Sequence, residues 1–191
     1  MTAGRQAITD TKDWCTPPKI VRAVKWVFGG HIALDPCSNQ HSIVGAETEF
    51  SLPETNGLAM SWDYATIYMN PPYGSDRSTG TTIKHWFAKL ADAHTKFGAE
   101  CIALVPVATN TDHWKRFVYP VASAICFLYD TRLKFHIDGF EDPKGAPMSC
   151  ACIYYGTEPS RFADAFDELG AVVYLDGIRL PQQHQLTLLT A

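Results

Sequence analysis

The alternation of short apolar runs with longer amphipathic segments is the feature that most constrains the fold of this chain. Apolar runs occupy residues 31–34, 66–69, 101–105, 124–128 and 150–155, and residues 171–175 are a further candidate. Short apolar runs bounded by turn residues are typical of strands that are buried on both faces. Because such strands need helices on both sides, we expect an α/β domain with a mainly parallel sheet.

Three segments carry apolar side chains at helical spacing, and they span residues 16–30, 83–98 and 162–170. The first begins with Thr16, which we expect to cap the helix, and two prolines that suit a first turn. Glycines end all three segments. Residues 1–12 are polar and lack periodicity, so we expect them to be disordered. No repeat or linker interrupts the remainder, and we expect a single domain over residues 1–191.

Composition restricts the functional classes only weakly. The 191 residues are 46% hydrophobic and 19% charged, with a net charge of −4. This charge excludes a generally basic DNA-coating protein, although local Lys and Arg can still contact phosphate. No apolar run approaches the roughly 20 residues of a membrane span, and the N-terminus lacks a signal-peptide core. We therefore expect a cytoplasmic protein with no membrane association and no obligate protein partner.

The cysteines and histidines do not indicate a metal site. Cys101, Cys126, Cys150 and Cys152 lie inside the strand-like runs, where a free thiol behaves as a small hydrophobic group. The chain has no Cys-x-x-Cys pair, and its histidines lack zinc-ligand spacing. We expect reduced, structural cysteines and no bound metal.

Three of the predicted strands end in polar or proline-containing turns, at residues 35–38, 70–73 and 106–110. In open α/β sheets, ligands bind outside the carboxyl ends of the strands. We therefore expect these turns to meet at one crevice although they are far apart in the sequence.

The second of these turns, Asn70-Pro71-Pro72-Tyr73, is the most informative motif. Consecutive prolines hold φ near −65° and donate no backbone hydrogen bond, so the chain leaves the sheet in a stiff, extended turn. Such a turn presents the Asn70 side-chain oxygen and the Pro71 carbonyl as two acceptors, which match the two N–H groups of a planar amine. Tyr73 offers a ring that can stack on the heterocycle bearing that amine. A simple strand-ending turn is the alternative interpretation.

This motif is the signature of amino-group methyltransferases, and the chain resembles the phage DNA N-6-adenine methyltransferase (Dam-like) family. The resembling stretches occur in the same order along most of the chain: residues 13–18, 34–38, 56–58 with Trp62, 70–74, 104–106, 131–135 and 146–147. The resemblance implies a Rossmann-like domain that transfers methyl groups from S-adenosylmethionine. It also implies a phage or prophage origin in a bacterial host.

The resemblance assigns the catalytic role to Asn70, Pro71, Pro72 and Tyr73. The resemblance implies that the acceptor is an adenine in double-stranded DNA that leaves the stack, since its N6 atom is otherwise out of reach. Asn70 and the Pro71 carbonyl would hold the N6 hydrogens while Tyr73 stacks on the flipped base.

For S-adenosylmethionine, the resemblance implies that Thr16 and Pro17 lie near the methionine part. Asp35 would face the methionine ammonium, a chemically sensible charge pair. The turn Asp35-Pro36-Cys37-Ser38 lacks the glycines that usually follow, so Cys37 or Ser38 would have to serve in their place.

Other candidate contacts depend on single residues. Ribose hydroxyls call for a carboxylate after the second strand, for which we prefer Glu47 over Glu49. Trp62-Asp63 is a candidate neighbour of the cofactor adenine, with a core tryptophan and a capping aspartate as the alternative.

Three cations are candidate DNA contacts. Arg77 lies in the polar segment 75–82, which either closes over the base or forms a plain surface loop. Arg132 and Lys134 belong to a segment resembling the family's Arg-Leu-x-Phe, and ordinary solvated charges are the alternative.

Several other functions remain open at this stage. The same fold can act on adenine in RNA, on cytosine N4 or on protein glutamine. A glutamine enzyme normally has a glycine-rich first turn and an added N-terminal helical domain, and a cytosine enzyme usually has serine in place of Asn70. A catalytically silent binding module is a different class, which cofactor titration would distinguish. The recognition sequence does not follow from these residues.

Overall fold

A computed structural model describes residues 14–76, 80–137 and 140–175 of the chain. The helices are α1 (Pro18–Val27), α2 (Ile83–Phe97) and α3 (Pro159–Phe166), with short turns η1 (Gly57–Ala59) and η2 (Trp114–Val118). The strands are β1 (Leu34–Asp35), β2 (Thr48–Glu49), β3 (Thr66–Met69), β4 (Ser75–Asp76), β5 (Thr81–Thr82), β6 (Glu100–Pro106), β7 (Ala124–Leu128), β8 (His136–Ile137), β9 (Phe140–Glu141), β10 (Cys150–Tyr155) and β11 (Gly170–Tyr174). The segment predicted to be disordered, residues 1–12, lies outside the described residues.

The central sheet has the strand order β11-β7-β10-β6-β3-β1-β2. Strands β2, β1, β3 and β6 are parallel neighbours. Strand β10 lies between β6 and β7 and is antiparallel to both, so β7 runs in the same direction as β6. Strand β11 closes the edge antiparallel to β7. The predicted α/β architecture with a mainly parallel sheet is confirmed, and the sheet is mixed at the β10 and β11 end.

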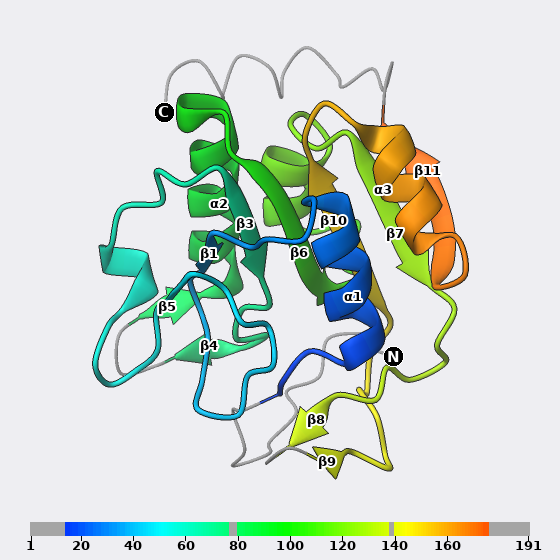
Figure 1. The fold of residues 1–191 in the computed structure, drawn as a ribbon, viewed down its shortest axis with the longest axis horizontal. Helices are drawn as coiled ribbons and strands as arrows, with labels where there is room; N and C mark the ends of the chain where they lie inside the picture. Colours follow the sequence, from blue (N-terminus) through cyan, green and yellow to red (C-terminus); the bar gives the residue numbers. More distant parts are fainter. Residues whose placement is uncertain (1–13, 77–79, 138–139, 176–191) are drawn as a thin grey trace.

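Helices cover both faces of this sheet, as Figure 1 shows. Alternation along β6 makes the two-sided packing visible: Ile102 and Leu104 belong to the core under α1 and α3. Cys101, Ala103 and Val105 belong to the core under α2 and η2. A strand with apolar residues on both faces is stable only when both faces are covered, which explains its continuous apolar sequence.

Helix boundaries depart from the sequence expectations at two places. Helix α1 begins at Pro18 with Pro17 as its cap residue, and Thr16 does not cap it. The Thr16 hydroxyl instead lies 2.8 Å from the buried Tyr68 hydroxyl. Helix α3 ends at Phe166, before the expected end at Gly170, and Gly170 is the first residue of β11. Helix α2 ends as expected, because Gly98 adopts a left-handed φ of 72°.

The three predicted turns share one edge of the sheet. Strands β1, β3 and β6 are adjacent and parallel, so residues 35–38, 70–73 and 106–110 all follow carboxyl ends on the same side. The three turns therefore lie at one edge of the sheet, and their meeting at one crevice stays a prediction. Among the described residues, no helix is long and apolar enough to span a membrane.

Candidate active site

Asn70 leaves β3 with its amide held in one orientation. Its Nδ2 donates a hydrogen bond of 2.9 Å to the backbone carbonyl of Trp14. Because a carbonyl only accepts, the amide nitrogen must face Trp14, and the Oδ1 atom becomes the acceptor on the other side. Pro71 is buried, and Pro72 is exposed. The motif therefore presents the amide oxygen that the sequence argument required.

Tyr73 belongs to a cluster of three aromatic rings. Trp14 and Phe135 stack with centroids 5.1 Å apart, and Tyr73 meets them edge-on at 6.1 and 5.9 Å. The Tyr73 hydroxyl donates to the Leu104 carbonyl at 3.2 Å. Burial raises the pKa of the phenol well above its usual value, so Tyr73 stays neutral. The role of Tyr73 as a stacking platform stays a prediction, and sequence analysis did not identify Phe135 as its neighbour.

Asp35 is a buried carboxyl group at the carboxyl end of β1. Only 3% of the residue is exposed, and its Oδ1 accepts a hydrogen bond of 3.1 Å from the Cys37 backbone. Burial raises the pKa of Asp35 to about 7, against the lowering effect of the Cys37 backbone hydrogen bond and with a smaller raising effect from the charge of Glu49. In the part of the chain that the structure describes, no cationic side chain pairs with this carboxyl.

Glu49 lies beside Asp35, whereas Glu47 does not. Strands β1 and β2 pair in parallel, with Asp35 opposite Glu49. Glu49 accepts hydrogen bonds from the Ser38 hydroxyl at 3.0 Å and from the Ala46 backbone at 3.1 Å. Glu47 comes before β2, and its exposed carboxylate lies 4.0 Å from His31. The structure thus brings Glu49 into the group, although sequence analysis preferred Glu47.

Cys37 connects the first turn with the catalytic motif. The backbone N–H of Asn70 faces its thiol and lowers the pKa of Cys37, while burial has the larger, opposite effect and keeps that pKa well above its usual value. The thiol is therefore neutral at ordinary pH, and Cys37 acts as a contact between two loops.

The segment Trp14–Cys15–Thr16 ties the loops of the site together. Beside the Trp14 bond to Asn70, the Cys15 thiol donates to the Asn39 side chain at 3.3 Å. Cys15 also pairs with His136 through two backbone hydrogen bonds of 2.8 and 3.0 Å. Thr16 is buried, and its hydroxyl shares a hydrogen bond with the hydroxyl of Tyr68 on β3. The hydroxyl therefore links this segment to the central sheet.

Asp63 lies away from these residues. It is exposed and precedes β3, while the site lies beyond the other end of that strand. Its neighbour Trp62 is a core residue whose Nε1 donates to the Gly57 carbonyl at 2.8 Å. The structure does not bring Asp63 together with Asp35 and Asn70, and its predicted contact with the cofactor stays a prediction.

Gly57 supports the candidate site, although the sequence argument from side-chain chemistry did not identify it. A Cβ atom at Gly57 would collide with the backbone carbonyl of Pro36. The loop at residues 56–58 therefore packs directly against the Asp35-Pro36-Cys37 turn and fixes its position. The only sequence signal was the presence of Asn-Gly-Leu among the stretches that resemble the family.

The candidate DNA contacts lie on the segment between β7 and β8. Arg132 and Lys134 are exposed, and they alternate with Leu133 and Phe135, which are buried. Because of this alternation, Arg132 and Lys134 face solvent while Phe135 stacks on Trp14. Arg77 lies outside the described residues.

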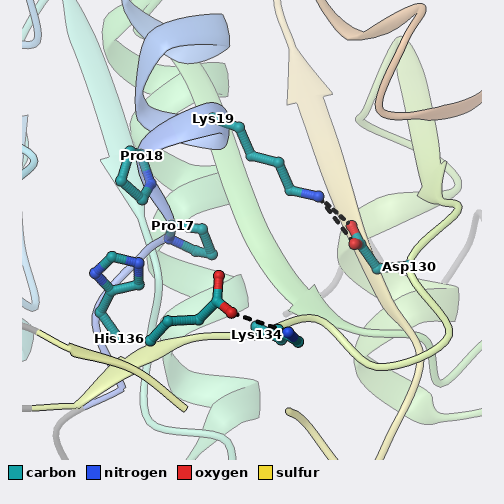
Figure 2. A pocket seen from close by; sticks show the side chains of 7 residues that line it. Pro17, Pro18, Lys19, Asp130, Lys134 and His136 are labelled. Atoms are coloured by element: carbon teal, nitrogen blue, oxygen red, sulfur yellow. Dashed lines mark hydrogen bonds and ion pairs between the residues drawn. The ribbon is translucent and has the colours of Figure 1, made fainter. Parts of the chain in front are cut away.

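A pocket of about 300 Å³ opens beside these loops at the start of α1 (Figure 2). Its lining residues are Pro17, Pro18, Lys19, Asp130, Lys134, His136 and Glu141. Among the described residues, no group of three or more His, Cys, Asp or Glu side chains is placed to hold a metal ion.

The family model for DNA N-6-adenine-methyltransferase (Dam) matches residues 5–158. The chain belongs to this family. The match includes the loops around Asp35 and Asn70 and the segment that carries Phe135, and it confirms the resemblance found in the sequence. The protein is thus an enzyme of the adenine-specific DNA methyltransferase class. Comparison with curated proteins and with solved structures found no match.

Proposed function

We propose that this Dam-family enzyme transfers a methyl group from S-adenosylmethionine to the N6 amine of an adenine flipped out of double-stranded DNA. The observation that carries the proposal is the Asn70 amide, whose nitrogen is engaged by Trp14 and whose oxygen remains the acceptor. An exocyclic amine donates two hydrogen bonds and therefore fits an acceptor pair made of this oxygen and the Pro71 carbonyl.

The residues around Asp35 have the chemistry needed for the methyl donor. A buried carboxyl without a cationic partner suits the methionine ammonium, and the exposed carboxylate of Glu49 suits the ribose hydroxyls. We therefore assign the ribose contact to Glu49 in place of Glu47. The Asp35-Pro36-Cys37-Ser38 turn supplies backbone contacts, and Thr16 and Pro17 support it from the start of α1. When bound, S-adenosylmethionine supplies an electrophilic methyl group that the N6 nitrogen accepts.

Asn70 activates the amine by geometry. In free adenine the N6 lone pair is conjugated with the ring, which makes it a poor nucleophile. Acceptors that hold both N6 hydrogens out of the ring plane direct the lone pair toward the methyl donor. The stiff Pro71-Pro72 turn keeps these acceptors in place before the base arrives, so little reorganisation is needed during reaction.

Tyr73 and its aromatic neighbours hold the flipped base in this proposal. An uncharged phenol ring beside Asn70 offers an apolar surface for the adenine, and base–aromatic stacking is worth about 1–3 kcal/mol. Arg132 would contact the phosphates next to the extruded nucleotide, as would Arg77, and Lys134 would contact the DNA from the same segment as Arg132. Such local cations are needed because the net charge of the chain is −4.

The test is transfer of labelled methyl from S-adenosylmethionine to unmethylated DNA, with the product nucleosides identified by mass. We expect N6-methyladenine, and we expect Asn70→Ala to remove most of it while cofactor binding is kept. Asp164→Ala is the control, since Asp164 is exposed on α3, outside the three turns at the edge of the sheet. Near-normal turnover by Asn70→Ala would refute the assignment.

Other products would identify other functions. N4-methylcytosine, or methyl transfer to RNA or to protein glutamine, would keep the fold and change the acceptor. Absence of S-adenosylmethionine binding would favour a silent binding module.

A further inference from the structure

The pocket at the start of α1 lies next to the proposed reaction site. Asn70 is bonded to Trp14, and the following residue, Cys15, pairs with His136 in the wall of the pocket. One residue step and two hydrogen bonds therefore separate Asn70 from this wall, a path of roughly 10 Å. Successive nucleotides are about 3.4 Å apart along a DNA strand, so the pocket is within reach of the base pairs that flank the flipped adenine.

Two lysine–carboxylate pairs line the pocket. Lys19 contacts both carboxylate oxygens of Asp130, at 2.9 and 2.7 Å. Lys134 contacts Glu141 at 2.9 Å. Figure 2 shows Lys19 and Asp130 pointing toward each other, with Pro17 and Pro18 on the side of Lys19 away from Asp130. All four charged side chains keep part of their surface exposed, from 29% for Asp130 to 56% for Glu141. The pocket therefore offers lysine hydrogen-bond donors beside carboxylate acceptors, and the rings of Pro17 and Pro18 add apolar surface to its lining.

Paired lysines are poor phosphate contacts because the neighbouring carboxylate cancels much of their charge and repels the phosphate. A base edge is different, since it carries no net charge and presents donors beside acceptors. Lysine characteristically donates to O6 and N7 of guanine, and Asp or Glu accepts from N4 of cytosine. A lysine–carboxylate pair thus has the two groups that match the two halves of one G·C pair.

We propose that this pocket determines sequence specificity by reading at least one G·C pair beside the target adenine. The reading groups are Lys134, which precedes β8, with Glu141 on β9, and Lys19 on α1 with Asp130, which follows β7. The inference rests on the proposed function, because it requires DNA to be the substrate. It makes the carboxylates essential, whereas a phosphate-binding site would work better without them.

The experiment measures methyl transfer to duplexes that carry one adenine with randomised flanking bases, followed by sequencing of the methylated products. We expect the unmodified protein to prefer G·C at one or more flanking positions. Glu141→Gln and Asp130→Asn keep the size of each side chain and remove its charge. Each variant is expected to lose preference at one position by roughly 10-fold, the scale of a good base contact.

A second readout separates base reading from phosphate binding. Freeing a lysine from its carboxylate is expected to tighten binding to non-target DNA and to steepen its salt dependence by about one released ion. Asp92→Asn is the matched control, because it frees Lys96 from a 2.8 Å pair on α2 away from the pocket. This control is expected to leave the flanking preference unchanged.

Unchanged flanking preference in both pocket variants, with normal melting temperatures, would overturn the inference and leave the proposed function intact. Failure of the unmodified protein to methylate adenine in any duplex would instead refute the proposed function. Loss of preference at a flanking position in either variant, with none in Asp92→Asn, would establish the pocket as the specificity site.

Discussion

Replacing Asp35 by asparagine is expected to stabilise the folded protein while weakening its binding of the methyl donor. Asparagine has the same shape as aspartate and keeps an oxygen for the hydrogen bond from the Cys37 backbone. The substitution therefore removes the ionisable group with little change in packing. Any change in stability reports on the charge of the buried carboxylate.

The magnitude follows from the pKa of Asp35, which burial raises from 3.8 to about 7. Between these values the folded state keeps a proton that the unfolded state has lost. Stability therefore falls as pH rises through this window, and the loss is complete above about pH 7. A shift of about 3 units at 1.36 kcal/mol each gives an upper limit of about 4 kcal/mol. Asp35→Asn escapes this loss, so its advantage is largest at about pH 8 and disappears near pH 4.

Ligand binding is expected to show the opposite preference. An ammonium group beside Asp35 favours the carboxylate, so binding by the unmodified protein should tighten as pH rises toward 7 and then level off. Asp35→Asn has no carboxylate to pair, so its binding should be weaker and should lack this pH dependence. The variant would thus be more stable and less able to hold S-adenosylmethionine.

Urea unfolding at several pH values between about 4 and 8, with parallel titration of S-adenosylmethionine, measures both effects. Asp164→Asn is the control, because this exposed aspartate on α3 lies outside the candidate site and should change neither curve. Parallel stability curves for Asp35→Asn and the unmodified protein would refute the reasoning, since they would mean that Asp35 titrates alike in both states. Retention of pH-dependent ligand binding by the variant would refute the ammonium contact.

Two further substitutions test the supports of the site. Gly57→Ala is expected to displace the Pro36 turn and to weaken cofactor binding, whereas Gly74→Ala, which has open space around it, should not; titration calorimetry compares the two. Tyr73→Phe removes the hydrogen bond to Leu104 and is expected to cost about 1 kcal/mol of stability while keeping most turnover, because the ring remains. Denaturant unfolding and initial rates check this, and a loss of turnover as large as in Asn70→Ala would contradict it.

Six of the seven strands in the central sheet and the second helix could be predicted from the sequence because their signals are local, although β1 begins only at Leu34 of the predicted run 31–34. The two-residue strands β2, β4, β5, β8 and β9 were not predicted. The run 66–69, in which Thr66 is followed by Ile67, Tyr68 and Met69, became β3. Gly98 ends α2 because glycine readily adopts the left-handed conformation found there. The catalytic motif is also local, since consecutive prolines stiffen a turn wherever they occur. Even the meeting of the turns at one edge followed from the general behaviour of parallel strands.

Tertiary structure alone decided the contacts between distant segments. Strand β10 lies between β6 and β7, and no local pattern records the partners of a strand. Glu47 and Glu49 are equivalent in sequence, but only the register of β1 with β2 puts Glu49 beside Asp35. Likewise the amide of Asn70 is oriented by Trp14, 56 residues away. Composition and periodicity report burial and local conformation, whereas the pairing that builds the site depends on packing of the whole chain.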